Sequence, residues 1–111
     1  MQFASLGSGS RGNSLIIASQ KTFIMIDCGF SLREVQRRMT RLALHPEQLA
    51  AVIVTHEHTD HISGVGVLAR KYQLPVYTSK GTAIAAQSKQ WPDIKTVIEN
   101  DPFNIGDLSL Q

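Results

Sequence analysis

The sequence predicts a mixed α/β fold in which helices cover a sheet. Short apolar runs rich in β-branched residues are typical of strands, and they alternate here with segments whose apolar residues recur at helical spacing. Taken in order, the pattern predicts three strands, then helix, strand, helix, strand and helix, and finally two strands. An alternation of this kind is typical of helices packed in layers on a sheet.

The first three elements are predicted to be strands. Residues 2–6 alternate loosely between polar and apolar and then run into glycines. Apolar runs at 15–17 and 23–26 flank the polar residues 19–21, which indicates a hairpin. Asp27 and the residues after it end the second run of this hairpin.

A helix is predicted to follow. Ser31 and Glu34 fit the S-x-x-E capping box that opens many helices. His45-Pro46 marks its end, because the residue before a proline disfavours helical geometry. Between them, apolar side chains recur at helical spacing, namely Leu32, Val35, Met39 and Leu42.

Several arginines occupy the rest of this helix. A net charge of only +2 favours a solvated face over a nucleic-acid contact. The residues concerned are Arg33, Arg37, Arg38 and Arg41.

The second half of the chain alternates strands and helices. The continuous apolar run at 49–55 predicts a strand buried on both faces. Further elements are expected as helices over 64–72 and 80–90 and as strands over 74–78, 95–99 and 108–111. Asp101-Pro102 and Gly106-Asp107 supply the turns between the last two strands.

Composition describes a single globular domain over residues 1–111. Of these residues, 42% are apolar and 18% are charged, which are values of folded soluble domains. No apolar run approaches the roughly 20 residues that a membrane span requires, and no signal peptide is visible, so a cytoplasmic protein without a membrane partner is expected. The lone Cys28 excludes an internal disulfide and a cysteine-rich metal site.

The most informative feature is an H-x-H-x-D-H pattern at residues 56–61, which holds three of the four histidines. It directly follows the buried strand predicted over 49–55, where open α/β sheets usually place ligands. In an extended segment His56 and His58 point to the same side, and neutral imidazole suits a metal such as zinc. Asp60 and His61 follow on a tight turn and can face a second ion. Two adjacent ions can clamp an attacked phosphoryl or carbonyl group.

A glycine-rich segment offers a rival interpretation. Residues 7–12 match G-x-G-x-x-G, the pattern of a dinucleotide site. Such a site needs a helix to begin at the glycine loop, whereas the residues that follow predict a strand. The loop can still offer backbone amides and side chains to a substrate phosphate, and a plain glycine turn is an equally good explanation. The side chains of this candidate phosphate loop are Ser8, Ser10, Arg11 and Asn13.

These motifs resemble a known family. Residues 55–64 resemble the second motif of the metallo-β-lactamase superfamily, and Asp27 resembles the aspartate of its first motif. The opening at residues 3–14 is similar to that of the YycJ-like branch, whose members are viewed as exonuclease-type phosphodiesterases. The resemblance implies that residues 1–111 form the N-terminal half of an αββα sandwich.

The resemblance also implies roles for individual residues. His56 and His58 would bind one divalent ion, and Asp60 and His61 a second. Zinc is the first choice, with manganese or iron as alternatives. Asp60 would be catalytic by orienting a metal-bound hydroxide, and Asp27 would support the metal loop through hydrogen bonds. DNA or RNA is the expected substrate.

The chain departs from the family in one respect. Members carry further histidines and a bridging aspartate downstream, but no histidine follows His61. A catalytic zinc requires about three protein ligands, so the motif by itself gives an incomplete site, and a longer parent protein is expected. Thioester or lactam hydrolysis, and a truncated non-catalytic binding domain, are the alternatives. Exposed apolar sheet surface would favour self-association.

Overall fold

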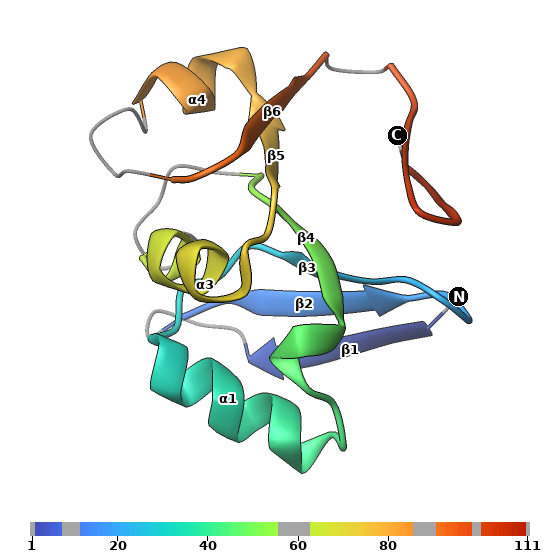
Figure 1. The fold of residues 1–111 in the computed structure, drawn as a ribbon, viewed down its shortest axis with the longest axis vertical. Coiled ribbons are helices and arrows are strands. Elements are labelled where there is room, and N and C mark those ends of the chain that lie inside the picture. The colour runs from blue at the N-terminus through green and yellow to red at the C-terminus, as the bar shows by residue number, and fades with distance from the viewer. Residues whose placement is uncertain (1, 8–11, 56–62, 86–90, 99–100, 111) are drawn as a thin grey trace.

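The computed structural model describes residues 2–7, 12–55, 63–85, 91–98 and 101–110. Figure 1 shows strands with helices on one side and a hairpin at the C-terminal end. In chain order the elements are β1 (Gln2–Gly7), β2 (Ser14–Ala18), β3 (Phe23–Ile26), α1 (Leu32–Arg41), the 3-10 helix η1 (Pro46–Gln48), β4 (Leu49–Ile53), α3 (Val65–Tyr72), β5 (Val76–Ser79), α4 (Lys80–Ala85), β6 (Ile94–Val97), β7 (Phe103–Ile105) and β8 (Leu108–Leu110).

The first six strands form one sheet in the order β1-β2-β3-β4-β5-β6. The pairs β1–β2 and β2–β3 are antiparallel, whereas β3–β4, β4–β5 and β5–β6 are parallel. Four neighbouring strands therefore finish at the same edge of the sheet. This is the edge at which α/β proteins bind ligands.

The sheet buries apolar side chains on both faces. Met25 and Val52 of the strands pack with Val35 and Met39 of α1 and with Leu68 of α3 on the helical face. The alternation of side chains along a strand sends their neighbours to the opposite face. That second face holds a smaller cluster, which consists of Ile17, Ile24, Ala51, Ile105 and Leu108.

The hairpin of β7 and β8 contributes to this second cluster and is held on the sheet by the β2–β3 turn. Asp107 donates its backbone N–H to Thr22 Oγ1 at 3.3 Å and accepts a hydrogen bond from Ser19 Oγ at 2.5 Å. The rings of Tyr77 and Phe103 stack with centroids 5.6 Å apart. The hairpin therefore covers part of the face opposite the helices.

Helix α1 begins as its sequence predicts. The Ser31 hydroxyl accepts the backbone N–H of Glu34 at 3.3 Å. Glu34 also accepts hydrogen bonds from the side chains of Arg37 and Arg38. The helix buries Val35 and Met39 against the sheet. Both the start of the helix and its buried face are therefore as the sequence predicts.

The predicted fold class is confirmed, and four elements differ in detail from the prediction. The residues after Asp101-Pro102 form β7, which was not predicted because three residues between two turn signals are too short for a period to show. Residues 46–48 form η1 where only a break was expected. The strand expected over 49–55 ends at Ile53, and the helix expected over 80–90 is seen over Lys80–Ala85, with 86–90 outside the described residues. Among the described residues, none of the helices is long and apolar enough to cross a membrane.

The ion pairs of Glu34 predict an acid-dependent contribution to stability. Hydrogen bonds from Arg37 and then Arg38 lower the pKa of Glu34 from its ordinary 4.5 to about 2. The unfolded chain binds this proton at a higher pH than the folded chain, so the contribution is complete above pH 4.5 and lost as the pH falls toward 2. Between these values the free energy of unfolding should fall more steeply in the wild type than in Glu34→Gln. Urea unfolding as a function of pH measures this, and parallel curves would contradict it.

Candidate metal centre

Asp27 lies at the carboxyl end of β3 and is 6% exposed. Its backbone N–H donates to the carbonyl of Ile53 at 2.7 Å, which ties it to the neighbouring strand β4. Its φ is 60°, in the left-handed region. Aspartate enters this region more readily than most residues, so the chain turns sharply out of the sheet here while the carboxylate stays buried.

The carboxylate of Asp27 is directed at Thr55. Its Oδ1 accepts the backbone N–H of Thr55 at 2.8 Å, and its Oδ2 accepts the Thr55 hydroxyl at 2.5 Å. Hydrogen bonds to an ionised carboxylate are stronger than those between neutral groups. Asp27 thereby fixes both the backbone and the side chain of the residue that precedes the predicted ligand segment.

The other end of that segment is fixed to the same loop. Gly64 donates its N–H to the carbonyl of Cys28 at 2.8 Å, and Ser63 Oγ donates to the carbonyl of Gly29 at 2.9 Å. A Cβ at Gly64 would lie 1.8 Å from the carbonyl oxygen of Phe30. Only glycine permits this approach, so the chain is held close to residues 27–30 on both sides of residues 56–62.

The 27–30 loop is in turn anchored to the start of β2. Ser14 Oγ donates to the carbonyl of Asp27 at 2.8 Å, and Gly29 donates its N–H to the carbonyl of Asn13 at 3.0 Å. Cys28 is fully buried, and burial raises the pKa of its thiol to about 11. The thiol is therefore protonated at neutral pH, and Cys28 packs in the core on the helical face of the sheet.

The ring of Phe30 leaves no space for a side chain at either end of the glycine-rich segment. A Cβ at Gly7 would lie 2.8 Å from Phe30 Cζ, and a Cβ at Gly12 would lie 2.6 Å from Phe30 Cε1. A strand, β2, follows the segment and not a helix, so the dinucleotide alternative lacks its required context. Sequence reasoning missed the packing role of these glycines because it depends on Phe30, which lies far along the chain.

The described residues bring together only part of the predicted site. Asp27 and Asn13 lie within them, and the carbonyl of Asn13 contacts the 27–30 loop as stated above. Among the described residues, no three histidine, cysteine, aspartate or glutamate side chains are grouped as a metal site would require. The remaining predicted residues lie outside the described part of the chain, namely His56, His58, Asp60, His61, Ser8, Ser10 and Arg11.

The family follows from a comparison of the whole sequence. A model of the metallo-beta-lactamase superfamily matches residues 7–103. The chain belongs to this superfamily. The match includes Asp27 and the H-x-H-x-D-H segment, so the resemblance first seen in the motifs extends over the domain.

Metallo-beta-lactamase superfamily relatives of known name include two bacterial exodeoxyribonucleases. The chain is 36% identical to exodeoxyribonuclease YycJ of Bacillus anthracis, over 97% of this chain and 40% of that protein. It is 38% identical to exodeoxyribonuclease WalJ of Streptococcus pneumoniae, over 81% of this chain and 34% of that protein. The chain thus spans about two fifths or less of the length of these relatives.

Solved structures confirm the fold. Rm3 metallo-beta-lactamase superimposes with a TM-score of 0.78 at 21% identity, over 96% of this chain and 46% of that one. At this identity the likeness concerns the arrangement of the backbone alone. Superfamily members typically bind divalent metal ions, and in this chain the H-x-H-x-D-H pattern directly follows Thr55 in the sequence.

The hydrogen bond between Asp27 and the Thr55 hydroxyl is testable by substitution. Thr55→Val keeps the shape of the side chain but removes the hydroxyl, and it should lower the free energy of unfolding by about 1–3 kcal/mol because a buried carboxylate loses a donor. Thr55→Ser keeps the hydroxyl and should cost clearly less. Urea unfolding of the two variants measures the difference, and equal losses would contradict the role given to the hydroxyl.

Proposed function

We propose that this chain carries the H-x-H-x-D-H metal-ligand motif of a two-metal hydrolase. This hydrolase would cleave phosphodiester bonds of nucleic acid in the manner of an exonuclease. The observation that supports it is the double hydrogen bond from Thr55 to Asp27. Together with the bonds of Ser63 and Gly64 to the same loop, it fixes both ends of the ligand segment at the carboxyl edge of the parallel strands. Hydrogen bonds that hold the ligand-bearing segment in place orient metal ligands and raise the affinity for the metal.

The donor set of the segment fits two divalent ions. We assign His56 and His58 to one ion and Asp60 and His61 to the other. Imidazole nitrogen and carboxylate oxygen are donors that zinc accepts readily, so zinc is the first choice, with manganese or iron as alternatives. The carboxylate of Asp27 holds Thr55, the residue directly before this segment, through two hydrogen bonds.

Each group then has a separate task. When bound, a metal pair polarises the scissile phosphoryl group and lowers the pKa of a water molecule. The carboxylate of Asp60 orients the attacking water and accepts a hydrogen bond from it. Asp27 does not touch the substrate; it positions the ligand segment through Thr55.

The names of the relatives support nucleic acid as the substrate, since both of those described above are exodeoxyribonucleases. Cellular DNA and RNA are the substrates proposed here, and we therefore propose a cytoplasmic location for this chain. A catalytic zinc requires about three protein ligands, and the motif supplies two for each ion. We therefore assign the remaining ligands to the rest of a longer protein, because the relatives extend well beyond the matched part.

Two experiments, zinc binding by this chain and substrate cleavage by the longer protein, separate the proposal from its alternatives. Isothermal titration with zinc should detect binding by this chain. His56→Ala and His58→Ala should each weaken this binding by at least about tenfold. Asp27→Asn should also weaken it, by about 10–100-fold, because Asp27 is proposed to support the ligands. His45→Ala is the matched control, since His45 lies exposed at the start of η1, and it should bind zinc like the wild type.

The substrate is then tested with the longer, zinc-loaded protein that supplies the remaining ligands, because this chain alone should show weak activity or none. In the longer protein, end-labelled DNA and RNA should be shortened from one end, and this should disappear in His58→Ala. Hydrolysis of thioester or lactam substrates in place of nucleic acid would favour another hydrolase class of the superfamily. Zinc binding without any turnover would favour a non-catalytic binding domain, and absence of zinc binding would overturn the metal centre itself.

A further inference from the structure

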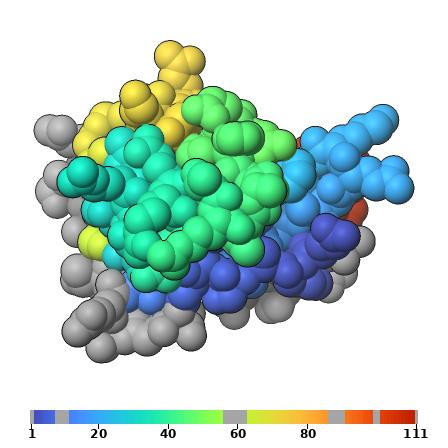
Figure 2. Space-filling view, turned by 90° about the horizontal axis from the view of Figure 1, so that it is seen from below, coloured from blue at the N-terminus to red at the C-terminus, as the bar shows by residue number. Residues whose placement is uncertain are grey.

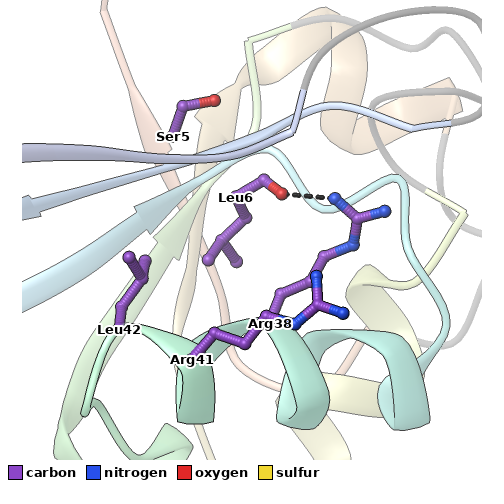
Figure 3. Close-up of a pocket in the computed structure, with 5 residues that line it drawn as sticks. All are labelled: Ser5, Leu6, Arg38, Arg41 and Leu42. Atoms are coloured by element: carbon purple, nitrogen blue, oxygen red, sulfur yellow. Dashed lines mark hydrogen bonds between the residues drawn. The ribbon is translucent and has the colours of Figure 1, made fainter.

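A cavity of about 190 Å³ lies between β1 and α1, and none of the residues assigned to the metals is among the described residues that line it. Figure 3 shows its lining, with two guanidinium groups from α1 on one side and the backbone of β1 above them. The liquid volume of one water is about 30 Å³, so the cavity has room for a phosphate group and part of its sugar. Its lining residues are Ser5, Leu6, Arg38, Arg41 and Leu42.

One of the two arginines is held by the protein itself. Leu6 is an extra residue in β1, because the pairing with β2 shifts between Ser5 and Gly7, and a bulge of this kind leaves backbone groups without their usual partners. Arg38 Nη1 donates to the carbonyl of Leu6 at 2.6 Å. Its Nε also bonds Glu34 at 2.8 Å, and its guanidinium lies 4.2 Å from the centroid of the Phe30 ring. Arg38 is thereby a fixed wall of the cavity.

The second arginine is exposed and differs from the first. Within the described part of the chain, Arg41 forms no hydrogen bond or ion pair. The acidic residue nearest to it along the helix, Glu34, is already engaged by Arg37 and Arg38. Glu34 thus compensates the charge of Arg38, and the charge of Arg41 is left for an anion. The planar guanidinium is well suited to bind phosphate with two hydrogen bonds.

A short chain of contacts links the cavity to Asp27 at the carboxyl edge of the sheet. Gly7, the residue after Leu6, pairs with Ser14 of β2. The hydroxyl of Ser14 in turn bonds the carbonyl of Asp27. Figure 2 shows α1 and β1 side by side on one face of the molecule.

We infer that this cavity binds a backbone phosphate of a nucleic-acid strand, with Arg41 as the direct contact. The inference rests on the proposed function, since it takes the substrate class from there. Arg38 holds the wall, and the side chains of Leu6 and Leu42 give the sugar an apolar surface. The arginines of α1 therefore divide into two groups: Arg37, which is paired with Glu34, fits the solvated face expected from the sequence, whereas Arg41 has a different role.

Fluorescence anisotropy with a labelled single-stranded oligonucleotide tests the inference, with EDTA present so that no metal takes part. Arg41→Ala should weaken binding by about tenfold or more, and it should reduce the slope of log affinity against log salt by about 0.7, the value for one lost phosphate contact. Arg33→Ala is the matched control, because it removes the same charge from an exposed position of the same helix outside the cavity. It should leave the slope unchanged.

Two further results decide between a specific contact and a general charge effect. Arg41→Lys keeps the charge but loses the paired donors, so its affinity should fall between those of the wild type and Arg41→Ala. Equal losses in Arg41→Ala and Arg33→Ala, or full affinity in Arg41→Ala, would overturn the inference. Zinc titration without DNA tests the metal centre separately, so a failure of one leaves the result of the other readable.

Discussion

One constraint underlies this part of the molecule: the chain on both sides of residues 56–62 is attached to the loop formed by residues 27–30. On one side the carboxylate of Asp27 holds the N–H and hydroxyl of Thr55. On the other side the carbonyls of Cys28 and Gly29 accept hydrogen bonds from Gly64 and Ser63. A buried carboxylate is costly unless it is hydrogen-bonded, and here that cost is offset by bonds that also hold Thr55, the residue before the proposed ligand segment.

The rest of the fold supports this loop. Parallel pairing of β3 with β4 brings Asp27 next to Thr55, because both residues follow strands that end at the same edge. The turn out of β3 is possible because aspartate tolerates the left-handed backbone at this position. Gly64, Gly7 and Gly12 allow neighbouring backbone to approach Phe30 and its carbonyl, which seats the loop on the helical core. Fold and site are thus specified by the same few contacts.

The sequence predicts those parts of the fold and of the candidate site that depend on residues close together along the chain. The capping box at Ser31, the buried strand before His56 and the H-x-H-x-D-H pattern each depend on residues that are close together in the sequence, so they could be predicted from it. The partner of Asp27, the close packing around Phe30 and the role of Arg38 at the bulge of β1 depend on residues far apart along the chain, which spacing alone does not reveal. Residues 103–105 were missed as a strand because so short a segment pairs only through its neighbour β8.

Amide hydrogen exchange of this chain tests the central constraint most directly. The N–H groups of Thr55 and Gly64 should exchange as slowly as that of Val54, which donates to the carbonyl of Tyr77 at 2.8 Å within the sheet, and Asp27→Ala should abolish the protection of Thr55. Exchange of both amides at the rate of an unprotected peptide would contradict the account, because the ligand segment would then have no fixed ends.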